Sequence, residues 1–187
     1  MLPVIIIIVV GLVLLAGVVI AIYNGLIQKR LRVDEARSQI EVQLKRRWDL
    51  IPNLVNSVKG YMEHEQNTLT RVTDARASAV SAGGQGPAAQ AQAENALTGT
   101  LRSLFSVMEN YPQLKANENV LKLQEELTTA ENQIAFSRQH FNATVRDYNQ
   151  GIGTFPALVL AGMFGFRARE FFDAPEEAQE VPEIRLY

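Results

Sequence analysis

Nineteen consecutive residues near the start of the chain, from Val4 to Ile22, carry no charge and no strongly polar side chain. A helix rises 1.5 Å per residue, so about 20 such residues cross the roughly 30 Å hydrocarbon core of a bilayer. The run therefore predicts a transmembrane anchor with the lipid bilayer as its partner. Tyr23 follows directly, and an amphipathic ring is typical of the headgroup level. The residues that define this predicted anchor are Val4, Ile8, Leu12, Leu15, Val19 and Tyr23.

Two other interpretations of this run were weighed. A secretory signal peptide needs basic residues before a shorter apolar run, and a small-x-small cleavage site after it. Nothing basic precedes Val4, the run is long, and no Ala-x-Ala motif precedes the polar boundary. A buried core helix is the second alternative, but a helix that is apolar on every face rarely lies at the end of a soluble chain. We therefore expect the anchor to be retained.

Basic residues predict the orientation of the anchor. Only the α-amino group of Met1 lies before the run, whereas basic side chains are frequent after it. The positive-inside rule places the basic flank in the cytoplasm. We expect a single-pass membrane protein, with its N-terminus outside and its C-terminal domain cytoplasmic. The basic residues after the run are Lys29, Arg30, Arg32, Arg37, Lys45, Arg46 and Arg47.

Composition limits the remaining possibilities. The chain has 187 residues, a net charge of −2 and no cysteine. Beyond the anchor there is room for one domain of ordinary size. The charge gives no basic field for nucleic acid, and the lack of cysteine excludes disulfides and thiolate chemistry. No segment after the anchor alternates like a strand, so the predicted class is all-α.

Apolar residues spaced by threes and fours predict an up-and-down four-helix bundle behind the anchor. The predicted division is an anchor over residues 1–27, a helical bundle over 28–172 and an acidic flexible tail over 173–187. The predicted helices cover residues 28–81, 88–110, 118–150 and 155–170. The first is long enough to hold the bundle away from the membrane.

Local signals shape these predicted helices. Pro52 lies inside the first one, yet the apolar register continues across it, so we expect a bend there and no reversal. Glycines and a proline between Ser81 and Pro87 predict a break. Asn117 or Asn119 is expected to cap the third helix.

The apolar segment from Thr154 to Phe166 allows two interpretations. Its roughly 13 residues are too few to cross a bilayer. The first interpretation is a buried fourth helix, and the second is an interfacial segment that contacts lipid or another subunit. The residues that would make such a contact are Phe155, Leu158, Leu160, Met163, Phe164 and Phe166.

Nothing in the sequence predicts an enzyme, a cofactor or a metal site. A di-metal bundle needs Glu three residues before His, and neither His64 nor His140 has it. No glycine-rich loop has the Lys of a phosphate-binding motif. Several charged residues do fall on or beside the apolar stripes, where they are expected to form interhelical ion pairs or, alternatively, a polar groove for a ligand. These residues are Glu65, Arg76, Glu131 and Arg138.

The lone tryptophan, Trp48, occupies a stripe position of the first predicted helix. An aromatic side chain at such a position is expected in the core, with a contact between subunits as the alternative.

The chain contains the long blocks QLKRRWDLIPNLV at 43–55, ENYPQLKAN at 109–117 and LQEEL at 123–127. In these blocks, and over nearly its whole length, it resembles the LemA family of bacterial membrane proteins. The resemblance implies a helical bundle behind a single N-terminal anchor and no known catalytic residues. It also points toward membrane organisation, because one branch of the family is associated with magnetosome membranes. The absence of Lys or Arg before the anchor, unlike many relatives, favours the N-out orientation.

We expect a structural membrane protein that scaffolds partners or self-associates as a homo-oligomer. The alternative is a membrane-tethered adaptor that recruits an unidentified protein partner through its bundle surface or acidic tail. Nucleic acid is not expected as a partner.

Overall fold

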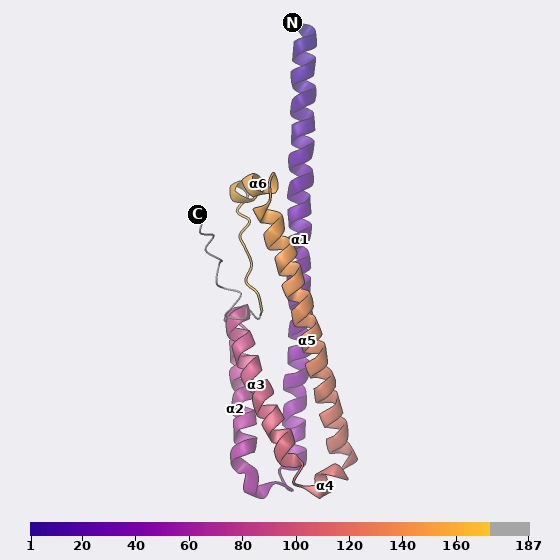
Figure 1. The fold of residues 1–187 in the computed structure, drawn as a ribbon, viewed down its shortest axis with the longest axis vertical. Coiled ribbons are helices and arrows are strands. Elements are labelled where there is room, and N and C mark those ends of the chain that lie inside the picture. Colours follow the sequence, from indigo (N-terminus) through magenta and orange to yellow (C-terminus); the bar gives the residue numbers. More distant parts are fainter. Residues whose placement is uncertain (173–187) are drawn as a thin grey trace, which may run out of the picture.

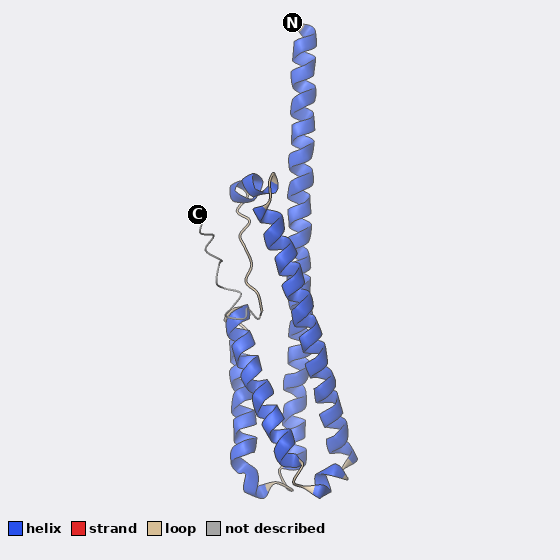
Figure 2. Ribbon diagram, in the orientation of Figure 1, coloured by secondary structure: helices blue, strands red, loops and turns tan. Residues whose placement is uncertain are grey.

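The structure, a computed structural model, describes residues 1–172, so the predicted acidic tail at 173–187 lies outside the described residues. The described part is helical, without a β-strand (Figure 2). Its elements are α1 (Leu2–Val58), the 3-10 turn η1 (Glu63–Glu65), α2 (Gln66–Ala82), α3 (Pro87–Met108), α4 (Pro112–Lys115), α5 (Glu118–Gly153) and α6 (Ala157–Met163).

The N-terminal part of α1 projects alone beyond the other helices (Figure 1). It contains an 18-residue apolar stretch that is long enough to cross a membrane, and none of this stretch is buried against the rest of the protein. The predicted anchor residues from Val4 to Tyr23 lie on this part of α1. By length, composition and exposure it is a candidate membrane-spanning helix.

The single helix predicted over 28–81 is wrong, because α1 ends at Val58 and the chain reverses through Lys59–Met62. From there α2 runs back beside the lower half of α1 (Figure 1). The buried residues Val58, Met62 and Leu69 keep the helical spacing across this reversal, which hid it in the sequence. The bend expected at Pro52 is not confirmed, since α1 continues through that residue as helix.

Two other local predictions are confirmed. The glycine-rich break separates α2 from α3, and Gly86 there has a φ of 103°, a conformation that side-chain-bearing residues rarely adopt. The Asn117 side chain caps α5 by accepting hydrogen bonds from the backbone N–H groups of Asn119 and Val120, at 3.1 and 3.3 Å.

The fourth bundle helix predicted over 155–170 is also wrong. Only Ala157–Met163 are helical, and α6 lies across the long axis beside α1 (Figure 1). The chain then returns along α5 without regular structure as far as Phe172, which is buried. The four longer helices α1, α2, α3 and α5 run side by side, so the observed set differs from the predicted one.

The core forms two apolar clusters along the helical axis. The lower cluster joins the end of α1 to α2, α3, α4 and the start of α5, and the upper one joins α1 mainly to α5 and the returning chain. Trp48 packs against both. The lower cluster includes Ile51, Leu54, Leu97, Leu101, Leu104 and Leu127. The upper cluster includes Ile40, Leu44, Ala91, Ile134, Phe141 and Phe172.

No bare stalk separates the helical domain from the end of the apolar stretch. The Lys29 ammonium pairs with Asp147 of α5 at 2.6 Å, and Gly151 lies against Lys29 and Leu26. Because α5 follows α1 this far, the packed domain begins within a few residues of Tyr23.

Candidate functional site

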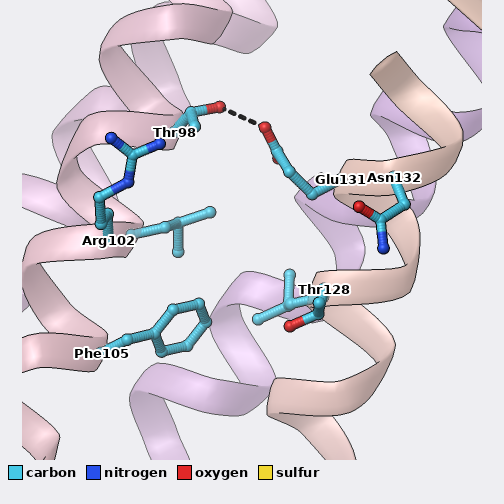
Figure 3. A pocket seen from close by; sticks show the side chains of 8 residues that line it. Thr98, Arg102, Phe105, Thr128, Glu131 and Asn132 are labelled. Atoms are coloured by element: carbon cyan, nitrogen blue, oxygen red, sulfur yellow. Dashed lines mark hydrogen bonds between the residues drawn. The ribbon is translucent and has the colours of Figure 1, made fainter. Parts of the chain in front are cut away.

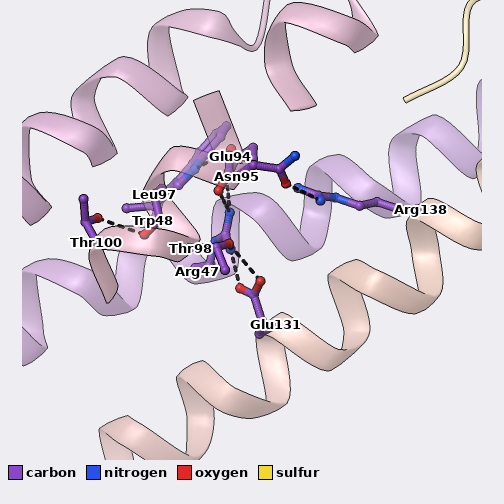
Figure 4. Close-up of polar contacts among 9 residues, drawn as sticks. All are labelled: Arg47, Trp48, Glu94, Asn95, Leu97, Thr98, Thr100, Glu131 and Arg138. Carbon is purple, nitrogen blue, oxygen red and sulfur yellow. Dashed lines mark hydrogen bonds and ion pairs between the residues drawn. The ribbon is translucent and has the colours of Figure 1, made fainter. Parts of the chain in front are cut away.

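A charged layer separates the two apolar clusters. Arg47 of α1 lies between Leu44 and Ile51, Glu94 of α3 between Ala91 and Leu97, and Glu131 of α5 between Leu127 and Ile134. Each of these flanking pairs has one member in the upper cluster and one in the lower. Three helices thus contribute one charged side chain each at the same level of the core (Figure 4).

The guanidinium of Arg47 is the centre of this layer, and its side chain is 0% exposed. It donates hydrogen bonds to the carboxylates of Glu94 and Glu131 and, at 2.9 Å, to the hydroxyl of Thr98. Thr98 in turn donates to Glu131 at 2.8 Å. A buried charge is costly unless it is paired and hydrogen-bonded, and here one arginine holds α3 and α5 against α1.

The carboxylate of Glu94 is also fully buried. One oxygen accepts from Arg47, and the other accepts from the indole N–H of Trp48 at 3.0 Å. Burial raises the pKa of Glu94 above its ordinary value of 4.5, and the charge and hydrogen bonds of Arg47 oppose that rise. Trp48 is thus a core residue with a specific polar role.

The four charged residues predicted to form ion pairs or a polar groove make different contacts in the structure. Glu131 forms an interhelical ion pair with Arg47 in this layer. Arg138 donates to Asn95 of α3 at 2.8 Å and lies over the Phe172 ring at 5.0 Å. Glu65 accepts a 3.5 Å hydrogen bond from the Tyr111 hydroxyl. Arg76 donates to the backbone carbonyl of Trp48 at 2.6 Å.

Arg47 and Glu94 are buried core residues that are not among the predicted ones, although the spacing around each of them indicates burial. Arg47 follows Leu44 by three and precedes Ile51 by four, and Glu94 precedes Leu97 by three. Both therefore extend an apolar stripe with a charge. Two opposite charges on the stripes of different helices are the pattern that predicts a buried pair.

A surface cleft opens beside the layer, between α3 and α5 (Figure 3). It has a volume of about 180 Å³, and Glu131, 39% exposed, lies at its edge. A second hollow, of about 220 Å³, shares Phe105 with the first in its lining. The first hollow is lined by Thr98, Leu101, Arg102, Phe105, Leu127, Thr128, Glu131 and Asn132. The second is lined by Phe105, Met108, Glu109, Leu114, Lys115, Val120, Leu121 and Gln124.

This geometry suits binding. The Glu94 side chain is fully buried, and the carboxylates of Glu94 and Glu131 both form ion pairs with Arg47. Among residues 1–172, no group of three or more His, Asp or Glu side chains could hold a metal ion. The cleft offers apolar side chains rimmed by charges of both signs, which is the composition of a surface that receives protein side chains.

The residues of segment 154–166 that were predicted to contact lipid or another subunit lie near the end of the apolar stretch of α1. The Tyr23 ring lies 5.0 Å from the Phe164 ring and 5.7 Å from the Phe166 ring, both edge-on. Leu160 and Phe166 are partly buried, whereas Phe155, Leu158, Met163 and Phe164 are exposed.

An exposed apolar helix long enough for a membrane, joined to a helical domain with a charged core layer, defines a class of membrane-associated helical proteins. Residues 36–186 match the model of the LemA family, which is most of the chain. The chain belongs to the LemA family, as its sequence blocks indicated.

The known relatives include proteins named for magnetosomes. Magnetosome protein MamQ of Magnetospirillum gryphiswaldense is 28% identical over 174 residues, covering 80% of this chain and 64% of MamQ. Magnetosome protein MamQ 2 of Paramagnetospirillum magneticum is 26% identical over the same coverage. Protein LemA of Metamycoplasma hominis is 26% identical over 155 residues, covering 82% of this chain and 69% of the relative. This chain thus spans less than two thirds of the length of the MamQ proteins.

Proposed function

We propose that this chain is a non-catalytic structural protein, anchored in a bacterial inner membrane, that self-associates through the cleft between α3 and α5. Its helical domain lies on the cytoplasmic side, and its N-terminus lies outside. The observation that carries the proposal is the cleft, whose lining includes the apolar side chains of Leu101, Phe105 and Leu127.

A second copy of this chain fits the cleft by its charge pattern. A two-fold interface presents the same patch twice, so it must be self-complementary. The rim supplies cations at Arg102 and Lys115 and anions at Glu109 and Glu131. The apolar side chains that association would remove from water are Phe105, which is half-buried, and Leu121, which is 47% exposed. Leu101 and Leu127 form the floor beneath them and are already buried.

The relatives support a structural role at a membrane. MamQ is named a magnetosome protein, and the exposed apolar part of α1 gives this chain the means to stay in a bilayer. An adaptor for a different protein is the second candidate, because the same cleft could receive a foreign side chain.

Two neighbouring threonines on α5 provide a matched test. Thr128 lines the cleft, whereas Thr129 is exposed outside it. Native mass spectrometry of full-length protein released from lipid nanodiscs should show oligomers for the natural chain and for Thr129→Arg. Thr128→Arg should shift the population to monomer, because a long cation then occupies the cleft.

Equal oligomer populations in the two variants would exclude the cleft as the contact. A natural chain that stays monomeric at all concentrations would contradict self-association and leave the adaptor as the better function.

A further inference from the structure

The helix α6 and its flanks form an apolar surface that nothing in the described protein covers. Phe155 is 84% exposed and Met163 is 75% exposed, and Leu158, Val159 and Phe164 are each more than half exposed. Within α6 itself only Ala161 is buried. Residues 154–166 contain no charged side chain. A contiguous exposed apolar patch of this kind marks a contact with lipid or protein.

The position of α6 favours lipid over protein as the partner of this apolar patch. The run from Val4 to Ile22 is about 28 Å long as a helix, which matches the hydrocarbon thickness and puts Tyr23 at the boundary. The Tyr23 ring touches Phe164 and Phe166. The apolar surface of α6 is therefore continuous with that of α1 and lies at the level where the anchor leaves the bilayer.

The returning chain holds α6 in this place. The Tyr148 hydroxyl donates to the carbonyl of Arg167 at 3.0 Å. The Asn149 side chain donates to the carbonyl of Arg169 at 2.9 Å and accepts from its N–H at 2.8 Å. Both donors belong to α5, so α6 is fixed to a rigid helix whose other end forms the cleft wall.

Basic side chains lie next to the apolar patch, on the side that faces the helical domain. Arg30 and Arg32 on α1 and Arg167 after α6 are exposed. Cations just below an apolar surface are placed to reach anionic headgroups, which attract them over a Debye length.

We infer that α6, with Phe155 and Phe164, inserts into the headgroup and acyl boundary of the leaflet from which α1 emerges. The protein then meets the bilayer at two points, and α5 is oriented relative to the membrane plane. This inference rests on the membrane anchoring in the proposed function and does not depend on self-association.

The absence of cysteine allows single labels to test this contact in the full chain. We would place a fluorescent NBD label on Met163→Cys and reconstitute the protein in phosphatidylcholine vesicles with 30% phosphatidylglycerol. Lipids with a nitroxide near the headgroup report insertion, and iodide reports exposure to water. The matched aqueous control is Phe136→Cys, 69% exposed on α5 and about 22 Å further from the anchor than Gly151. The anchor control is Val13→Cys.

We expect nitroxide lipids to quench the label at 163 several-fold more than the label at 136, and iodide to do the reverse. Equal behaviour at 163 and 136, with the label at 13 still in lipid, would overturn the inference and leave the anchor intact. A label at 163 shielded from both quenchers, with disulfide crosslinks between copies of the unlabelled Met163→Cys protein under an added oxidant, would instead assign the patch to a second copy. A label at 13 accessible to iodide would overturn the anchoring and the inference together.

Discussion

Pro52 is tolerated inside α1 because another helix supplies a hydrogen bond that the proline removes. Proline has no N–H, so the carbonyl four residues earlier, that of Trp48, has no partner within the helix. The Arg76 side chain of α2 donates to this carbonyl at 2.6 Å. The same contact fixes α2 beside α1 after the reversal at Lys59–Met62.

We predict that Arg76→Ala destabilises the protein by about 1–3 kcal/mol, the cost of an unsatisfied buried acceptor. The loss should be smaller in a Pro52→Ala background, because alanine restores the N–H that Trp48 needs. Urea denaturation in detergent, followed by Trp48 fluorescence, gives the free energies for this double-mutant cycle. Additive effects of the two substitutions would show that Arg76 acts independently of the proline.

Glu94 gives the core a pH dependence whose sign follows from its raised pKa. The unfolded chain releases this proton near 4.5, whereas the folded chain holds it to higher pH because burial disfavours the carboxylate. Between these two values the unfolded state binds fewer protons, so the free energy of unfolding falls as pH rises.

The variant Glu94→Gln removes this titration and keeps the side-chain shape. We therefore predict that the stability of the natural chain relative to Glu94→Gln decreases as pH rises above 4.5, and levels off above the raised pKa. Urea midpoints at stepped pH measure the difference. A relative stability that grows with pH over this range would mean that Arg47 outweighs burial.

Among the helical elements, the connection between α2 and α3 depends on one glycine. Gly86 has φ 103° and ψ 163°, a region that is essentially restricted to glycine. Gly84 in the same turn lacks a positive φ, and a Cβ there would meet open space. We predict that Gly86→Ala costs about 1–3 kcal/mol and Gly84→Ala costs little, as thermal unfolding by circular dichroism would show. Similar losses at both positions would contradict this account of the turn.

Which elements the sequence predicts depends on whether the signal is local. The cap at Asn117 and the break before Pro87 are local, and both are confirmed. The reversal after Val58 is not, because Val58 and Met62 are both fully buried and continue one apolar spacing through a turn. Gly60 follows the last turn of α1 and is a typical signal for the end of a helix. The apolar spacing that continues past Gly60 nevertheless favours an unbroken helix.

The candidate site shows the same limit. The buried residues of α3 and α5 follow from periodicity, but the pairing of Arg47 with Glu94 joins residues 47 positions apart. Which helix faces which is a tertiary property that periodicity does not contain. The helix predicted over residues 155–170 is longer than α6 for a related reason, because an uncharged run predicts burial without specifying whether protein or lipid covers it.

At the scale of the whole molecule, the apolar surface of α6 and the cleft lie on opposite sides of the charged layer. The upper cluster and α6 lie toward the anchor, and the lower cluster borders the cleft, at the far end of α3 and α5. Because Arg47 ties α1 to both α3 and α5, the cleft is held at a fixed place along α1.

The basic residues after the apolar run predict how the whole chain is oriented across a membrane. Lys29, Arg30 and Arg32 lie within about ten residues of the predicted anchor, where the positive-inside rule acts, and no basic side chain lies between Met1 and Val4 on the other side. A membrane-impermeant maleimide should label Leu2→Cys in intact bacterial cells. It should label Phe136→Cys only after the cells are permeabilised, since that residue lies on the helical domain. Labelling of Phe136→Cys in intact cells would invert the topology and place the cleft outside the cytoplasm.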